Sequence, residues 1–337
     1  MDEVKNPFVN AKVVRTGVDT ETYLQQADGI GRGHPGYVQS RSDLAMLREC
    51  AWKWVHGWTF NGSDSTDWGD LIDCKYLTKD RFAKRYAVTP PSYDTTVMRC
   101  PACRSVGHSK SCRKCGVERK PVKITKPWNR TAQVCQDWEL NAGDKTIISQ
   151  EDNTQSDNAV KMLWGDPDCR ELRECSQTQV MVVGEYRDKE TGLVIPVKCL
   201  IDLLPASIHP RFGKCVADLK TSKNASPHAW DSDVFYRNYD MQAAMELWLY
   251  TAATGEDRNH FRHIVSESPP PWLCEMRLMS GQLLQIGQGK VIEALRLYCQ
   301  CLKEGKWPKY AATAQAKGGE IIDGCLVEQA KPWMLGA

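Results

Sequence analysis

Two short apolar runs that each end in an aspartate place the strongest constraint on the fold of this chain. The first is Leu200-Ile-Asp202, and the second, Lys214-Cys-Val-Ala-Asp-Leu-Lys220, adds a lysine two residues beyond its aspartate. Side chains two residues apart in a strand lie on the same face, so Asp218 and Lys220 project together. If the two runs are neighbouring strands, Asp202 and Asp218 converge beside the Lys220 ammonium group.

Such an arrangement would suit phosphodiester hydrolysis. Two carboxylates are good ligands for Mg²⁺ or Mn²⁺, and an adjacent lysine positions a water molecule or stabilises developing negative charge. The alternative is two acids at strand ends with a solvated lysine, because the spacing Asp-x-Lys is common. The spacing alone does not decide between these interpretations.

The pattern around the two runs predicts an α/β fold of the α+β type, with a central mixed β-sheet flanked by helices. A hairpin precedes the second run, a helix follows it, and two further strands lead to a long final helix. The expected strands are 179–186, 193–204, 214–220, 261–266 and 272–279, and the main expected helices are 67–88, 238–254 and 282–303, with another after Ser40.

The helix expected at 238–254 has a polar stripe formed by Tyr239, Gln242, Glu246 and Tyr250. A polar stripe at helical spacing usually faces solvent. Because this helix follows the run that ends at Lys220, Gln242 is also placed to hydrogen-bond a group of the proposed site or a phosphate.

Two C-x-x-C pairs lie eight residues apart, at Cys100 and Cys103 and at Cys112 and Cys115. Four thiolates in two such turns form a closed tetrahedral set for structural Zn²⁺. An iron–sulfur cluster is the second possibility, because four cysteines also hold clusters. His108 lies between the pairs and is a competing ligand.

The cysteine pairs lie within a basic segment. Residues 99–130 contain ten Lys and Arg residues and one acid, a net charge of +9, so the remainder of the chain carries about −7 of the total of +2. This concentration favours contact with DNA phosphates or with a partner protein, and a solvated basic loop is the alternative. The candidate DNA-binding residues are Arg104, Lys110, Arg113, Lys114, Arg119 and Lys120.

Composition narrows the class of protein further. The N-terminal residues lack the apolar segment of a signal peptide, and no run of about 18 apolar residues predicts a membrane span. We therefore expect a cytoplasmic protein without a membrane partner, in which the 15 cysteines serve as metal ligands and buried thiols and do not form a disulfide framework.

Four segments are expected. Residues 1–35 form an irregular N-terminal arm, 36–310 form the main domain, 96–127 form a small zinc-ribbon-like insertion within it, and 311–337 form a loosely attached tail.

The run from Gly192 to Gln242 resembles the PD-(D/E)xK nuclease superfamily, specifically its RecE-like (exonuclease VIII) exodeoxyribonucleases. The residues that carry the resemblance are Ile201-Asp202, Ala217-Asp-Leu-Lys-Thr-Ser222 and Asn238-Tyr-Asp-Met-Gln-Ala-Ala244. Weaker similarity at Ser40–Leu44, Trp68–Asp73 and Gly305–Pro308 extends it over most of residues 36–310. The resemblance implies a restriction-endonuclease-like core.

The resemblance also implies roles for individual residues. Asp202, Asp218 and the Leu219 carbonyl would bind the active-site metal, Lys220 would be the catalytic lysine, and Gln242 matches a glutamine that relatives carry on the next helix. Asp73 stands where many relatives have histidine and is a further candidate ligand. The upstream glutamate of the family has no clear counterpart: Glu185 is near but out of register, and Gln177 and Gln179 lie closer to the expected place.

The activity implied is Mg²⁺-dependent hydrolysis from the 5′ ends of linear double-stranded DNA, which leaves 3′ single strands for phage-type recombination. Relatives of this kind act as rings of subunits, work with a single-strand annealing protein and are encoded by phages or prophages in bacterial cells. The alternatives are a non-catalytic, zinc-containing DNA- or partner-binding protein on a decayed nuclease fold, and an iron–sulfur recombination nuclease or an endonuclease.

Overall fold

The computed structural model describes residues 5–26, 29–57, 64–310, 318–323 and 325–328. The chain divides into two compact units. The first consists of Met1–Leu77 with Ala159–Ala337, and the second of Thr78–Asn158.

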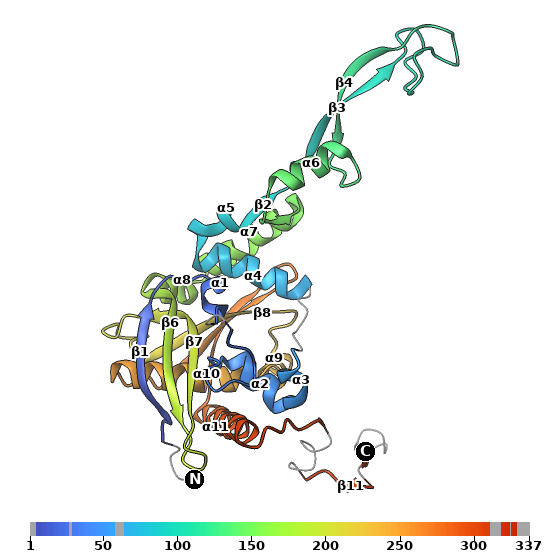
Figure 1. Ribbon diagram of the computed structural model, residues 1–337. Helices are drawn as coiled ribbons and strands as arrows, with labels where there is room; N and C mark the ends of the chain where they lie inside the picture. Colours follow the sequence, from blue (N-terminus) through green and yellow to red (C-terminus); the bar gives the residue numbers. More distant parts are fainter. Residues whose placement is uncertain (1–4, 27–28, 58–63, 311–317, 324, 329–337) are drawn as a thin grey trace, which may run out of the picture. The chain divides into compact units, whose positions relative to one another are not determined.

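A six-stranded sheet forms the centre of the first unit (Figure 1). All neighbouring strands are antiparallel except β8 and β9, which are parallel. The mixed α/β fold predicted from the sequence is therefore confirmed. In spatial order the strands are β1 (Phe8–Arg15), β6 (Ser176–Arg187), β7 (Val194–Pro205), β8 (Cys215–Ser222), β9 (His260–Glu267) and β10 (Cys274–Leu278).

Strand β1 corrects the expectation of an irregular arm, because Phe8–Arg15 pairs with β6 at the sheet edge. The pairing register shifts twice, between Val9 and Lys12 and between Val13 and Arg15. Each shift interrupts the two-residue alternation by which a strand is recognised in sequence. The bulges therefore explain why the polar-looking segment was not predicted as a strand.

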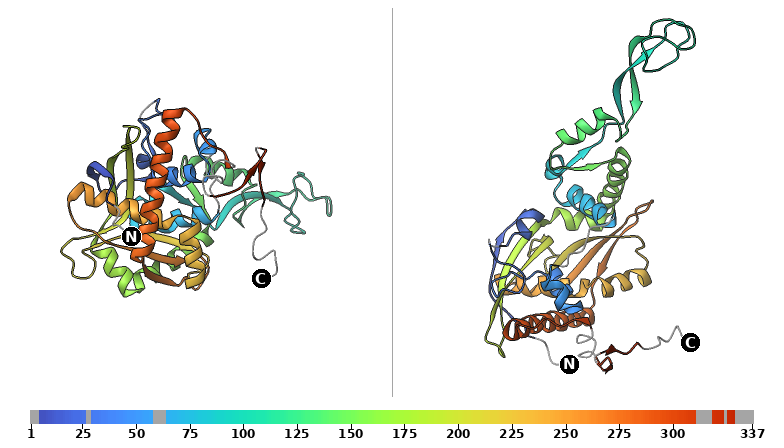
Figure 2. Two further views of the ribbon diagram at one scale, coloured as in Figure 1. Left: turned by 90° about the horizontal axis from the view of Figure 1, so that it is seen from below. Right: turned by 45° about the vertical axis from the view of Figure 1, so that its right-hand side comes forward.

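One face of the sheet is covered by α10 (Tyr239–Thr254), with α11 (Gly281–Glu304) and α2 (Arg41–Glu49) packed against it (Figure 2). Every residue from Tyr239 to Tyr250 is buried. A helix that is buried on all sides lies inside the protein, so α10 is the central helix of this unit. Its core also includes residues of α3 (Ala51–Val55) and α9 (Pro227–Tyr236).

A second core lies on the opposite face of the sheet. There α4 (Asp64–Leu77), α8 (Pro167–Glu174) and the C-terminal part of α7 (Gln150–Gly165) pack against β8 and β9, with Ile72, Leu163, Leu172 and Leu219 among the buried residues. The unit also contains α1 (Thr20–Leu24) and a short pair, β11 (Ile321–Ile322) with β12 (Cys325–Leu326).

The second unit contains a long hairpin whose strands, β3 (Ser92–Arg99) and β4 (Lys120–Pro127), pair without interruption. Its remaining elements are η1 (Lys79–Arg81), α5 (Phe82–Arg85), the parallel pair β2 (Tyr86–Val88) and β5 (Thr146–Ile148), α6 (Gln133–Asn141) and the start of α7. The helix expected at 67–88 is therefore wrong at its end, because α4 stops at Leu77 and residues 86–88 form a strand. The compact unit extends beyond the 96–127 insertion on both sides.

Within the described residues, no helix is both long and apolar enough to cross a membrane. The tail expected at 311–337 lies largely outside the described residues.

Candidate active site and cysteine cluster

The two candidate metal-binding aspartates lie on adjacent antiparallel strands, Asp202 on β7 and Asp218 on β8. The backbone N–H of Leu219 donates a hydrogen bond of 3.1 Å to Asp202 Oδ2. The structure thus brings the two carboxylates together at the centre of the sheet. We call the group formed by Asp202, Asp218, Lys220, Gln242 and Glu246 the acidic site.

Lys220 projects from the same face of β8 as Asp218, and its Nζ forms an ion pair with Asp218 Oδ2. Leu219 points into the core on the opposite face. Burial opposes the charge on Lys220, but Asp218, Tyr239 and Asp202 together raise its pKa above the ordinary value. Lys220 is therefore an ammonium group at neutral pH, suited to orienting a nucleophile or offsetting charge and not to removing a proton.

The two aspartates differ in their readiness to ionise. Burial and the charges of Asp218 and Asp73 raise the pKa of Asp202 well above its usual range. Burial also acts on Asp218, but Lys220 and His263 outweigh it and lower the pKa. Asp218 is thus the stable carboxylate, and Asp202 becomes one readily only when a cation offsets the surrounding negative charge.

Gln242 connects this group to α10. Its amide donates to Asp218 Oδ1 at 2.6 Å and to Glu246 Oε1 at 2.8 Å, and its carbonyl oxygen accepts a bond of 2.9 Å from Arg41 Nη2. The polar stripe of this helix is therefore buried around the site and does not face solvent. Gln242 fixes the orientation of Asp218 through these bonds.

Glu246 was not predicted as a site residue. It is 2% exposed, and its Oε2 has no hydrogen-bond partner among the described residues. Burial and the charge of Asp218 raise its pKa well above the usual value. Its position four residues after Gln242 was the available signal, because such residues are neighbours on a helix surface.

A backbone irregularity lies beside Asp202. Gln179, on β6, has φ +53°, and the otherwise continuous β6–β7 register is interrupted where Gln179 faces Asp202. Its side-chain amide donates to Asp202 Oδ1 at 3.0 Å. Positive φ is costly for a residue with a side chain, and such conformations occur often at functional sites.

Glu185 does not belong to the site. It lies six residues beyond Gln179 on β6, roughly 20 Å along the strand, and accepts a hydrogen bond from Asn10 Nδ2 on β1. The strand register therefore rules out Glu185 as a ligand, and Gln179 occupies the position beside Asp202. Gln177, the other residue considered, pairs with Leu204.

His263 is a second residue near the site that sequence reasoning does not select. It lies opposite Asp218 in the parallel register of β8 and β9 and is surrounded by Trp230, Tyr239 and Phe261. Burial lowers the pKa of His263 to about 4, so its ring is neutral at physiological pH. A histidine within a predicted strand carries no distinguishing pattern.

A cavity of about 880 Å³ opens beside Lys220. Asp70 and Asp73 of α4 line it, as do Arg41 of α2 and Tyr239 of α10. The structure therefore brings Asp73 to the side of the site, where its charge acts on Asp202. Leu219 is also part of the cavity lining, although its side chain packs in the core on the opposite face of β8.

The acidic site fits a divalent cation. Its carboxylates lie close enough for one to raise the pKa of another, and hard carboxylate oxygens are the preferred ligands of Mg²⁺ and Mn²⁺. Asp202 and Asp218 would hold the ion, with Asp73 at the edge of the cavity as a further candidate.

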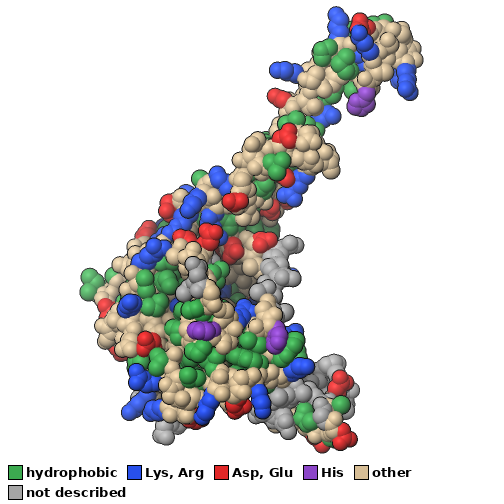
Figure 3. All heavy atoms as spheres, viewed as in Figure 1, with side chains coloured by type: hydrophobic (Ala, Val, Ile, Leu, Met, Phe, Trp, Pro, Cys, Tyr) green, Lys and Arg blue, Asp and Glu red, His purple; other side chains and the backbone are tan. Residues whose placement is uncertain are grey.

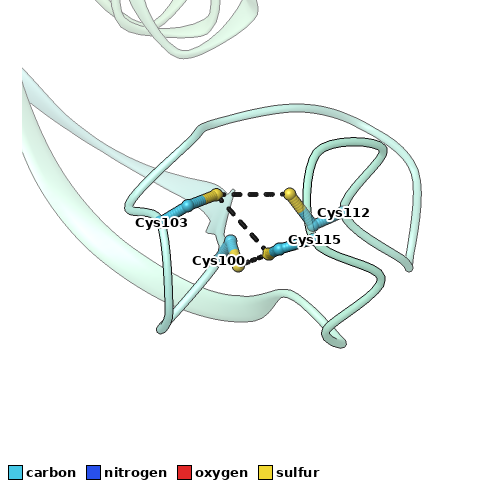
Figure 4. Close-up of side chains that lie close together, drawn as sticks. All are labelled: Cys100, Cys103, Cys112 and Cys115. Atoms are coloured by element: carbon cyan, nitrogen blue, oxygen red, sulfur yellow. Dashed lines mark hydrogen bonds between the residues drawn. The ribbon is translucent and has the colours of Figure 1, made fainter.

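The four predicted cysteines converge at the tip of the β3–β4 hairpin (Figure 4). Their Sγ atoms lie 3.3 Å apart for Cys100 and Cys115, 3.4 Å for Cys103 and Cys112, and 3.7 Å for Cys103 and Cys115. Zinc–sulfur bonds of about 2.3 Å in a tetrahedron require sulfur separations of about 3.8 Å. The cluster fits one metal ion of this kind with small adjustments.

The turns around the cysteines also match each other. Arg104 N–H donates to Cys100 O, and Gly116 N–H donates to Cys112 O. Arg104 and Gly116 both have positive φ, 58° and 71°. Gly116 adopts this conformation without steric cost, so the first turn is held at some cost by its surroundings.

Arg119 must be removed from the candidate DNA-binding residues. It is 7% exposed, and its Nη1 donates to the carbonyls of Ser109 and Ser111 and to the Ser109 hydroxyl. Arg119 therefore holds the loop between the two cysteine pairs. Basic side chains surround the hairpin tip (Figure 3), and the other five candidates, Arg104, Lys110, Arg113, Lys114 and Lys120, are exposed, with Lys110 paired to Glu118.

The fold and the acidic site together define a nuclease domain of the PD-(D/E)xK class. The family model described as "PDDEXK-like domain of unknown function (DUF3799)" matches residues 141–317, just over half of the chain, and the chain belongs to this family. The superfamily inferred from the sequence is thereby confirmed. The matched range contains Asp202, Asp218 and Lys220.

A solved structure has a similar fold over nearly the whole chain. It is a candidate exonuclease from Eubacterium rectale, 14% identical, with a TM-score of 0.50 over 96% of this chain and 99% of that one. The Rai1 protein of Scheffersomyces stipitis, in complex with (3′-NADP)⁺ and calcium, is 11% identical over 77% of this chain and 64% of its own, and its TM-score of 0.26 carries no argument. No curated protein matches the sequence.

Proposed function

We propose that this protein is a metal-dependent exodeoxyribonuclease that degrades linear double-stranded DNA from its 5′ ends with Mg²⁺ or Mn²⁺. The observation that carries the proposal is the convergence of Asp202, Asp218 and Lys220, of which Lys220 lines the adjacent cavity. The resemblance to RecE-like enzymes supports the choice of DNA ends and of 5′-to-3′ polarity. Generation of 3′ strands for phage-type recombination, a ring of subunits and a single-strand annealing partner complete the proposal.

Four residues of the acidic site have definite tasks in this proposal. A divalent ion bound by Asp202 and Asp218 would supply Lewis-acid stabilisation of the phosphate and lower the pKa of a bound water. Lys220, a permanent cation, orients the attacking water and offsets negative charge in the transition state. Gln242 holds Asp218 in place through the carboxylate oxygen Oδ1. The other oxygen, Oδ2, faces Lys220 and remains for the reaction.

The cysteine cluster has a structural task in this proposal. We assign Zn²⁺ to it, because four cysteines in one compact hairpin tip form a closed site with no position open for substrate. The tip lies in the second compact unit and presents exposed basic side chains for DNA or a partner protein.

The decisive experiment digests end-labelled linear duplex and covalently closed circular DNA side by side with Mg²⁺. Degradation of the linear DNA alone, with 5′ label released first, is the expected result. Asp218→Ala and Lys220→Ala, each checked for a folded state by circular dichroism, are expected to lower the activity by at least about 10²-fold. Cutting of the circle would indicate an endonuclease instead, and full activity in either variant would disprove the proposed site.

A further inference from the structure

Two large aromatic side chains stand exposed at the end of α9, beside the cavity of the acidic site. Phe235 is 63% exposed and Tyr236 is 79% exposed. Their rings are in edge-to-face contact, with centroids 5.2 Å apart and an interplanar angle of 84°. We call Phe235 and Tyr236 the aromatic pair.

The packing of α9 does not account for this pair. The helix buries Trp230 and Val234, which are four residues apart and form its core face. Phe235 and Tyr236 follow directly and lie off that face. Exposed aromatic rings leave a large apolar surface in water, so a partner that covers them would be stabilised.

The pair is held in a defined position. Lys290 Nζ of α11 lies 5.2 Å from the Phe235 ring centroid and forms an ion pair with Asp240. The chain then turns at Asn238, whose φ is +54°, before α10 begins. The aromatic pair is thus presented by a constrained turn between two helices.

The same turn is connected to the acidic site. Arg41 donates to the carbonyl oxygen of Arg237 through Nη1 at 3.3 Å and to Gln242 through Nη2 at 2.9 Å. Tyr236 and Arg237 line the cavity together with Lys220 and Arg41. One exposed aromatic ring and four basic side chains, those of Arg32, Arg41, Lys220 and Arg237, therefore border one cavity, and Asp70 and Asp73 also line it.

This combination identifies the kind of partner. Cations along a cavity attract phosphates, and exposed aromatic rings stack on bases; together they are the two elements by which proteins bind single-stranded nucleic acid. We propose that Phe235 and Tyr236 form a stacking platform for unpaired bases at the DNA end, so that the strand to be cut enters the cavity separated from its complement. This inference rests on the proposed nuclease function and specifies the form of DNA that the site accepts.

The platform has a direct consequence for substrate preference. On a blunt duplex the terminal base pairs must open before a base can stack on the pair, whereas a splayed end already offers unpaired bases. Loss of one stacked base weakens binding roughly tenfold to a hundredfold. Removal of the aromatic pair should therefore slow cleavage of blunt ends more than cleavage of splayed ends.

The test compares the natural protein with Phe235→Ala/Tyr236→Ala, with Tyr236→Phe, which keeps both rings, and with Ile208→Ala, a control at another exposed apolar residue of the same unit. Cleavage is measured with Mg²⁺ on duplexes of one sequence with blunt or splayed ends. Binding to duplexes carrying 2-aminopurine at the terminal position is measured in EDTA, so that it does not depend on activity. Thermal unfolding confirms that each variant is folded.

The double variant is expected to lose at least about tenfold in kcat/KM on blunt ends, with a smaller loss on splayed ends, and to abolish the 2-aminopurine fluorescence change. Ile208→Ala should behave like the natural protein, and Tyr236→Phe, which keeps the ring, should recover most of the cleavage and fluorescence change that the double variant loses. Equal binding and cleavage by the double variant would overturn the inference, as would a change in oligomeric mass without a change in DNA binding, which would assign the pair to a subunit contact. A natural protein that cleaves neither duplex would refute the nuclease proposal, and the binding measurement would still decide on the platform.

Discussion

The acidic site and the cysteine cluster are both small groups of reactive side chains, but the chain assembles them in opposite ways. The cluster joins residues 100–115 across one hairpin tip. The acidic site joins Asp202 on β7, two residues of β8 and two of α10, and Arg41 on α2 and His263 on β9 lie against it. The first depends on local spacing, whereas the second depends on the folding of the whole sheet.

The largest expected effect comes from removing one side chain from the acidic site and, in a second variant, one from the cysteine cluster. Lys220→Ala is expected to lower the rate of DNA cleavage by about 10²- to 10³-fold, as removal of a group that stabilises transition-state charge does, while the zinc content stays at about one per chain. Cys103→Ser should lower the zinc content and keep cleavage within about tenfold, because only phosphate contacts are affected. Cleavage rates and elemental analysis measure the two effects. Equal loss of activity in both variants would show that the regions do not act separately.

The second largest effect concerns the pH dependence of stability, and it belongs to the sheet region alone. His263 has a folded-state pKa of about 4 against an ordinary value of 6.5, so the unfolded chain binds more protons between these values. The stability due to neutral His263 is therefore full above pH 6.5 and is lost as the pH falls toward 4, by up to about 3 kcal/mol.

Urea unfolding in EDTA at pH 7 and pH 4.5 measures this dependence, with His263→Phe as the variant that cannot titrate. Phenylalanine suits a site formed by Trp230, Tyr239 and Phe261. The natural protein should lose more stability than the variant over this interval. Asp218, Lys220 and Arg41 also act on His263, but burial is the largest cause of its shift. An identical slope in both proteins would mean that His263 titrates alike in the folded and unfolded chains, which would contradict the lowered pKa.

The same contrast explains how much of the protein could be predicted from sequence. The mixed sheet and the four cysteines follow from alternation and spacing, which are local properties, and the resemblance to a nuclease superfamily adds the pairing of Asp202 with Asp218. Gln179, Glu246 and His263 could not be selected in this way. Each acquires its role from a partner at least 20 residues away, Asp202 or Asp218, and only the strand register and the burial of α10 show it.

The errors have the same origin. Glu185 was considered because it is close in sequence to the expected position, but the β6–β7 register places it at the other end of the strand. Arg119 counted as one basic residue among ten, and the hairpin tip uses its guanidinium internally. Net charge identifies a basic segment, but it does not distinguish the cations that face solvent from those that hold the loop.

Arg119 and Lys120 therefore provide a matched pair of substitutions at the tip. Arg119→Ala removes hydrogen bonds to Ser109 and Ser111 and should speed transfer of zinc to a chelator roughly fivefold, since one net hydrogen bond contributes about 1 kcal/mol. Lys120→Ala should leave zinc transfer unchanged. If Lys120 contacts a phosphate, its loss lowers the salt dependence of DNA binding by about one unit of slope. The reverse assignment of the two effects would contradict the burial of Arg119.

The smallest expected effect probes how closely α4 approaches the acidic site. A Cβ added at Gly69 would lie 3.1 Å from Thr221 Oγ1, in the residue that follows Lys220. Alanine gains about 1 kcal/mol over glycine in a helix, so Gly69→Ala would stabilise the protein if α4 were free to move. We expect instead a net loss of about 1 kcal/mol in the free energy of unfolding and a slower reaction, because the helix that carries Asp73 must shift away from β8.

The combined variant Gly69→Ala/Thr221→Ala removes this contact. Since the two residues interact directly, its free energy of unfolding in urea should show the stabilisation that alanine gives a helix. Additive effects of the two substitutions would show that α4 adjusts without disturbing the site.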